Sequence, residues 1–188
     1  MQPTQRQFMQ QLPITAMLLL LVFIVAGCSK KIGIEHDTAV GIGPYSTFSG
    51  RLIVIEPKRR WQVALDWQAA SPENGWLRLS HAATGTVVEF RWLQNNMEVR
   101  DNSHPEWKSI NQQQLSKQGI VLPPQQLAGI LLGKMPAHFK QKSDTMWESK
   151  ATGSLIRIEW DAEKQRLTMT DILHGRRATL IIQSDIQS

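Results

Sequence analysis

The chain has 188 residues, of which 41% are hydrophobic and 20% charged, and it contains one cysteine. This length corresponds to a single domain, and one cysteine excludes an intramolecular disulfide and a zinc site built from several cysteines. The formal net charge of +5 is modest and spread along the chain, which argues against a nucleic-acid binder. Length and composition therefore exclude a multidomain enzyme, a disulfide-stapled miniprotein and a polytopic membrane protein.

Residues 1–27 have the features of a secretory signal peptide. Arg6 is the only charged residue in this segment, and an almost wholly apolar run over 14–26 follows it. Such a run is typical of a signal peptide and is shorter than the roughly 20 residues that span a bilayer. The only cysteine, Cys28, comes directly after Gly27, and this placement resembles a bacterial lipobox. The resemblance implies cleavage before Cys28 and acylation of Cys28; an uncleaved anchor with an incidental cysteine is the alternative.

The residue after Cys28 indicates where the protein is sorted. Many inner-membrane lipoproteins carry aspartate at this position, whereas this chain has Ser29. By analogy we expect the outer membrane, with the domain facing the periplasm and tethered stably by two or more acyl chains. Residues 28–47 mix glycine, proline and charge without periodicity and are predicted to be a flexible tether. The folded domain is expected over 48–188.

The first half of the domain shows the pattern of an antiparallel meander. Apolar and polar residues alternate strictly over 61–68, which is typical of a strand with one buried face. Shorter segments of similar character surround it at a spacing of about 8–12 residues, as in consecutive hairpins. The predicted strands are 48–55, 61–68, 76–81, 86–92 and 97–100.

The pattern changes in the middle of the chain, where two short helices are predicted. Asn111 can cap a helix over 112–118. The prolines at 123–124 are acceptable in the first turn of a second helix that ends near Leu132. Three further strands are predicted, over 153–160, 165–173 and 176–184. The fold class is therefore α+β, mainly β, with a curved antiparallel sheet and short helices against its concave face.

No catalytic or metal-binding motif is visible in the sequence. The histidines are scattered, no nucleophile elbow occurs, and most acidic residues lie on the polar side of the predicted strands. We therefore expect neither enzymatic activity nor a cofactor nor a metal site. The basic run 58–60 has two interpretations, a contact with anionic lipid headgroups or a solvated hairpin turn.

Several segments together resemble the LolB family of outer-membrane lipoprotein receptors. A lipobox, a tether and the segment 48–52 (FSGRL) occur in the same order as at the start of that family. The segment 119–123 (GIVLP) is followed by Leu127, by 131–133 (LLG) and by Pro136. This is similar to the family pattern G-x-x-(I/L)-P…L…(L/I)-L-G-x-x-P. The correspondence covers about residues 45–186, and the order of its elements is more specific than any single motif.

The resemblance implies an unclosed β-barrel of about eleven antiparallel strands, with the helices as a lid over an apolar cavity. The strands missing from the pattern above would lie within 97–110 and 138–151. The resemblance also implies that the protein receives acylated lipoproteins from the periplasmic carrier LolA and delivers them to the outer membrane. We expect a monomer whose partners are lipoproteins and a LolA-like carrier, with no nucleic acid.

The expected cavity lies between the lid and the apolar faces of the strands. A tightly packed core is the alternative explanation of the same apolar stripes. The residues predicted to line an acyl-chain cavity are Leu52, Val54, Trp61, Val63, Leu65, Trp67, Leu79, Val88, Phe90, Leu127, Ile130, Leu131, Ile156 and Ile158.

The sequence departs from the family in two places. The family's receptors expose a leucine, linked to membrane insertion, in the turn between the third and fourth strands. Here Ala82, Ala83 and Thr84 occupy the position of that membrane-insertion loop, and the turn has no leucine. The family also has a helix before its first strand, whereas residues 29–47 form a poor one. A second hypothesis is therefore kept, a structural or assembly lipoprotein of the envelope whose sheet binds a protein partner without lipid transfer.

Overall fold

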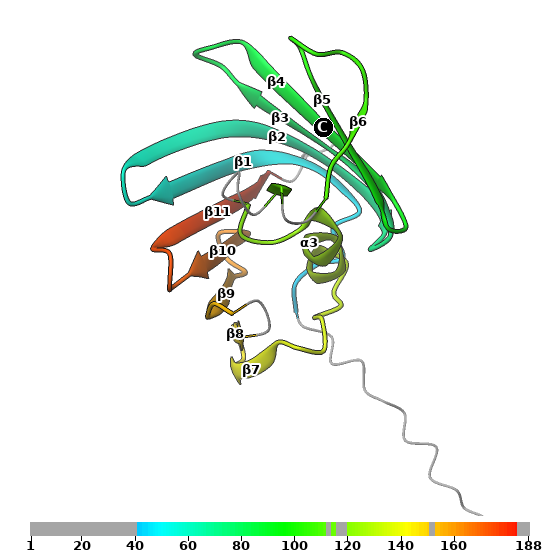
Figure 1. Ribbon diagram of the computed structural model, residues 1–188. Helices are drawn as coiled ribbons and strands as arrows, with labels where there is room; N and C mark the ends of the chain where they lie inside the picture. Colours follow the sequence, from blue (N-terminus) through cyan, green and yellow to red (C-terminus); the bar gives the residue numbers. More distant parts are fainter. Residues whose placement is uncertain (1–40, 112–113, 116–119, 151–152, 184–188) are drawn as a thin grey trace, which may run out of the picture. The chain divides into compact units, whose positions relative to one another are not determined.

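A curved antiparallel sheet of eleven strands forms the body of the domain, and helix α3 lies within its curve (Figure 1). The computed structural model describes residues 41–111, 114–115, 120–150 and 153–183. The predicted signal peptide, Cys28 and Ser29 lie outside these residues, as does most of the predicted helix over 112–118. The predicted fold class, a mainly β domain with an unclosed antiparallel sheet, is confirmed.

Two meanders make up the sheet. The first contains β1 (Thr47–Glu56), β2 (Arg59–Ser71), β3 (Asn74–His81), β4 (Thr86–Leu93), β5 (Asn96–Asp101) and β6 (Lys108–Ser109). After α3 (Pro124–Leu131), the second contains β7 (Lys140–Ser143), β8 (Met146–Ser149), β9 (Ile156–Asp161), β10 (Arg166–Asp171) and β11 (Arg176–Gln183). The spatial order is β6-β5-β4-β3-β2-β1-β11-β10-β9-β8-β7. The first and last strands are therefore neighbours, and β6 and β7 are the two free edges.

Eight of the strands lie where the sequence predicts them, within a few residues at each end. The other three, β6, β7 and β8, fall in the two segments to which the resemblance pointed. They have only two to four residues each, too few for alternation to be recognised. The helix α3 also lies where its two prolines predict it, and Gly133 adopts a φ of +85° just after its end.

One end of the interior is filled by aromatic rings. The Phe48 and Trp67 ring centroids are 6.1 Å apart, and those of Trp67 and Trp92 are 5.4 Å apart. A Cβ on Gly75 would lie 2.3 Å from Cζ2 of Trp92, so only glycine allows the indole to lie against β3. The buried side chains of the second half of α3 join this core, and we call this the packed end.

The C-terminal end of α3 is fixed to the start of the domain. The Tyr45 N–H donates a hydrogen bond of 2.7 Å to the Leu131 carbonyl oxygen. A Cβ on Gly43 would lie 2.1 Å from the same oxygen, so the close approach requires glycine there. Ile42 is buried beside them. Residues 42–46, which the sequence places in the tether, therefore already pack on the domain.

Candidate ligand-binding cavity

The opposite end of the interior is hollow. A cavity of about 270 Å³ lies between the inner faces of β1–β4, β10 and β11 and a cover formed by residues 120–122 and the first half of α3. We call this cover the lid. All lining side chains are apolar except His81 and Thr86, which stand where the β3–β4 turn begins and ends. A cavity with such walls favours an apolar occupant over water.

Nine of the fourteen residues predicted to form the cavity line it. They are Leu52, Val54, Trp61, Val63, Leu65, Leu79, Val88, Phe90 and Leu127. The structure places the other five, Trp67, Ile130, Leu131, Ile156 and Ile158, in the buried core and not among the residues that line this cavity. Alternation shows which face of a strand is inward, but it does not show which inward residues meet a neighbour and which meet a void.

Ten further residues line the cavity and were not predicted: Leu77, His81, Thr86, Ile120, Val121, Leu122, Pro124, Met169, Ala178 and Leu180. Some of these ten residues could have been predicted from the sequence. Met169 alternates with polar neighbours in β10, and Ala178 does so in β11, so the rule that selected β2 residues would have found them. Leu180 lies two residues after Ala178 and therefore on the same face of β11. The lid segment 120–122 has no periodicity from which its direction could be predicted.

The β3–β4 turn at the cavity edge is held by its own hydrogen bonds. The Thr84 hydroxyl donates to Thr86 Oγ1 at 2.8 Å and lies 3.0 Å from His81 Nδ1. The Gly85 N–H donates to the His81 carbonyl oxygen at 2.9 Å, and Gly85 has a φ of +65°, which glycine adopts without strain. The residues at the predicted membrane-insertion position, 82–84, are exposed and include no large apolar side chain.

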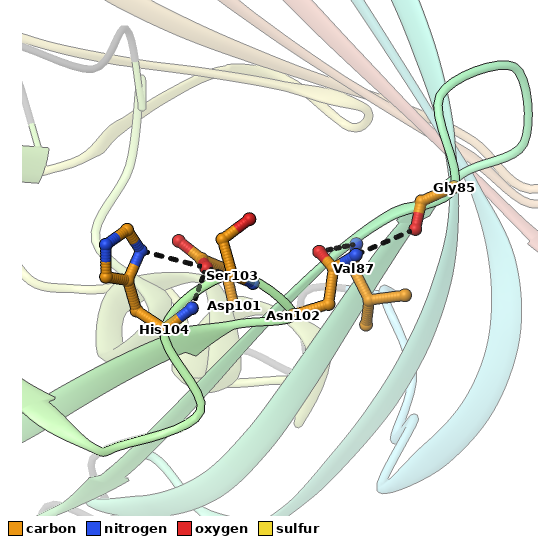
Figure 2. Close-up of polar contacts among 6 residues, drawn as sticks. All are labelled: Gly85, Val87, Asp101, Asn102, Ser103 and His104. Carbon is orange, nitrogen blue, oxygen red and sulfur yellow. Dashed lines mark hydrogen bonds and ion pairs between the residues drawn. The ribbon is translucent and has the colours of Figure 1, made fainter.

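The end of β5 braces the same turn (Figure 2). Asn102 accepts a hydrogen bond of 3.1 Å from the Val87 N–H and donates one of 3.3 Å to the Gly85 carbonyl oxygen. Next to it, Asp101 accepts a hydrogen bond of 2.6 Å from the His104 N–H. This backbone bond is the main reason why the pKa of Asp101 lies below its usual value. The turn is thus supported both from within and from the neighbouring strand.

Among the described residues, no group of three or more histidine, cysteine or acidic residues could hold a metal ion. No helix in the described ranges is long and apolar enough to cross a membrane.

An unclosed antiparallel sheet that curves around a helix and leaves a hydrocarbon-lined hollow at one end defines a class of β protein with a built-in apolar cavity. Comparison with known protein families shows which family within this class the chain belongs to. The family described as "Outer membrane lipoprotein LolB" matches residues 46–173, and the chain therefore belongs to the LolB family, which confirms the resemblance noted above.

Solved structures also show similarity to the chain. One of them is a crystal structure of a LolA superfamily protein from Nitrosomonas europaea, with a TM-score of 0.47 and 9% sequence identity. The match covers 79% of this chain and 89% of that one. No curated protein sequence matches the chain.

Proposed function

We propose that this protein is an outer-membrane-anchored lipoprotein that binds the acyl chains of other lipoproteins in its cavity. It would receive them from a LolA-like carrier, deliver them to the outer membrane, and itself be held there through acylated Cys28 on the periplasmic face. Membership of the LolB family supports a lipoprotein-binding role at the outer membrane. The observation that carries the finer proposal is the hydrocarbon lining of the cavity.

The size of the cavity suits part of an acyl chain. An apolar cavity of about 150 Å³ in another protein is large enough to bind benzene, and the cavity here is about 270 Å³. Each methylene group moved from water into such a site contributes about 0.8 kcal/mol. Burial of a chain segment therefore gives strong binding without any polar contact, and more of the chain can enter only if the lid moves.

The two ends of α3 differ in a way that allows this movement. The C-terminal end is bonded to Tyr45 and fully buried at the packed end. The N-terminal end carries Leu127 and Pro124 over the cavity and is preceded by the lid segment 120–122. Because the buried residues lie mainly in the second half of the helix, we expect the first half to swing outward about the fixed end when an acyl chain enters.

Transfer by this route needs no nucleotide. An acyl chain can pass from a weaker apolar site on the carrier to a stronger one here and then into the bilayer, each step lowering the free energy. The direction in which the acyl chain moves depends only on which apolar surface it can reach at each stage. The described part of the protein therefore needs no catalytic group for this role.

A charge placed on the lid tests the proposal. Leu127→Asp puts a carboxylate against the hydrocarbon walls, where an unpaired charge is costly, and we expect acyl-chain capture to fall at least tenfold. The measurement is photo-crosslinking of an acylated peptide, with a photoreactive group in its acyl chain, to the full protein in vesicles. Leu93→Asp is the matched control, because Leu93 is 62% exposed and does not line the cavity.

Crosslinks in the unaltered protein should map to lid and wall residues such as Val121 and Val88. If Leu127→Asp keeps its fold, measured by circular dichroism, and captures the peptide normally, the acyl-chain proposal is wrong. That result would leave the structural or assembly lipoprotein as the better explanation.

A further inference from the structure

Exposed apolar side chains gather beside the hollow end of the domain. Four large apolar residues in the described ranges are well exposed, and three of them lie here: Ile55 at 38%, Ile172 at 43% and Leu173 at 68%. Ile172 and Leu173 form the β10–β11 turn, and Ile55 lies near the end of β1. The two hairpin turns adjoin, since a Cβ on Gly175 would lie 3.5 Å from Cγ of Pro57. We call Ile55, Ile172 and Leu173 the tip patch.

Basic side chains surround the tip patch. Segments 55–60 and 171–177 contain five lysine and arginine residues and two carboxylates. Ile55 is paired with Arg60 on β2 and with Arg177 on β11, so an exposed guanidinium flanks it on either side of the same outer face. Among the described residues, no carboxylate lies within ion-pair distance of Arg60 or Arg177.

Some arginines elsewhere on the outer face are paired with carboxylates on neighbouring strands. Arg91 pairs with Glu98 across β4 and β5 at 2.6 Å, and Arg157 pairs with Glu148 across β8 and β9 at 2.8 Å. At the tips, Glu56 is engaged by Arg59, and Asp171 is buried under its own turn. Arg60 and Arg177 therefore keep uncompensated positive charge next to exposed apolar side chains.

We propose that the tip patch docks on an anionic phospholipid membrane. Leu173 and Ile172 would enter the apolar boundary of the bilayer, and Arg60 and Arg177 would bind lipid phosphates. Exposed apolar residues ringed by lysine and arginine are the composition that binds membrane interfaces. The β3–β4 turn at the same end offers only small or polar side chains, so it supplies no comparable anchor.

Docking in this way would bring the cavity to the membrane surface. Val54 and Ala178 line the cavity, and each is the immediate chain neighbour of a residue at the patch, Ile55 or Arg177. An acyl chain leaving the hollow would then cross little water. This consequence rests on the proposed function, whereas the docking itself requires no cargo.

The chain outside the structure is long enough for this orientation. β1 starts at the packed end, and its ten residues extend about 34 Å toward the tips. Residues 28–41 can span about 45 Å when fully extended. An acyl anchor on Cys28 can therefore reach the membrane on which the tips dock.

Site-specific fluorescence tests the docking. The full acylated protein is reconstituted in vesicles, with an environment-sensitive NBD label on His174→Cys in the tip turn or on Glu163→Cys in the β9–β10 turn at the other end. In vesicles that contain phosphatidylglycerol, the label at 174 should shift to the blue and be quenched by nitroxide lipids. The label at 163 should show neither effect, and pure phosphatidylcholine should weaken the effect at 174. The protein without an added cysteine controls for labelling of Cys28.

Substitutions of the basic residues and of the apolar residues test their contributions to docking separately. Removing one basic residue near an anionic surface is expected to reduce the affinity for the membrane about fivefold. The double variant Arg60→Glu with Arg177→Glu should therefore abolish the quenching at 174. Leu173→Asp should weaken this quenching strongly. Arg51→Glu, on the same outer face of β1 but away from the tips, should leave the quenching at 174 unchanged.

Equal quenching at 174 and 163, no dependence on lipid charge, or shielding of 174 only with a protein partner present would overturn the proposal. None of these readouts uses a cargo, so a failure of acyl-chain binding would not produce them.

Discussion

Asp171 is a buried carboxylate that closes the β10–β11 turn. It accepts hydrogen bonds from the Ser154 hydroxyl and from the His174 N–H, the latter at 3.2 Å, and its other oxygen lies 2.7 Å from His174 Nδ1. Burial alone would raise the pKa of Asp171, but these bonds together outweigh it and hold the pKa below its usual value. The folded protein therefore favours the charged carboxylate, and the turn that carries Leu173 depends on it.

The lowered pKa of Asp171 predicts a loss of stability in acid. Because the pKa is lower in the folded than in the unfolded chain, the stabilisation is present above the unfolded value of about 3.9 and disappears as the pH falls through the folded value. Asp171→Asn should reduce the free energy of unfolding by about 1–2 kcal/mol at pH 7 and by less at pH 3. Urea denaturation over a pH series measures this. Glu163→Gln, at an exposed position, is the control; an unaltered pH dependence in Asp171→Asn would contradict the prediction.

Single residues also show where prediction from the sequence stops. Trp61 and Trp67 belong to the same inward stripe of β2, and alternation treats them alike. The structure places Trp61 at the cavity wall and stacks Trp67 on Phe48 at the packed end. The difference depends on which residues of other strands and of α3 reach each level of the sheet, and this information is spread over the whole chain.

At the scale of elements, the two edge strands are short and charged. β6 has two residues and β7 four, all of them exposed, and β7 carries Lys140 and Lys142. Edge strands present unpaired backbone groups that another sheet can extend, and lysine on a short edge opposes this. These short, charged edges therefore oppose edge-to-edge pairing with another sheet, although the sheet does not close into a barrel.

Removal of the edge lysines should therefore promote association. Lys140→Val combined with Lys142→Val raises the β propensity of β7 and removes its charge, so we expect dimers or larger species by sedimentation velocity. Lys150→Val with Lys164→Val changes the same residue types outside the strands and should remain unaffected. If both double variants sediment as the unaltered protein does, the lysines do not protect the edge.

Elements differ in how clearly the sequence predicts them. Long strands with one buried face, such as β2, follow from alternation, and α3 follows from its prolines and from Gly133. The strands β7 and β8 are held largely by their neighbours in the sheet, because their own sequences have little apolar periodicity. The fold class was therefore predictable from residues, whereas the number of strands required the resemblance to a family.

The whole domain has one end that is packed and one that is hollow. At the packed end, aromatic rings and fully buried aliphatic side chains fill the interior; toward the open tips, the inward residues border a void. Both explanations of the apolar stripes, a solid core and a cavity, are therefore correct for different parts of the same sheet. Close packing and empty volume therefore lie at opposite ends of the domain.

This division predicts unequal costs for the same substitution. Leu167 is fully buried. Leu167→Ala should lower the free energy of unfolding by about 3–4 kcal/mol, because it removes contacts and leaves a new void. Leu79 is only partly buried at the cavity wall, so Leu79→Ala should cost about 1–2 kcal/mol. Urea denaturation of the two variants measures the difference. Equal losses would mean that the hollow end contributes as much packing as the other.

The pairing of β1 with β11 has a consequence for how the domain is made. Seven residue pairs from Ser49–Gln183 to Ile55–Arg177 join β1 to β11, so the middle of the sheet is completed only when β11 has emerged. A nascent or prematurely terminated chain that lacks β11 would expose the hydrogen-bonding groups along one side of β1. Such an intermediate invites aggregation, and chaperones would have to protect it until β11 has emerged.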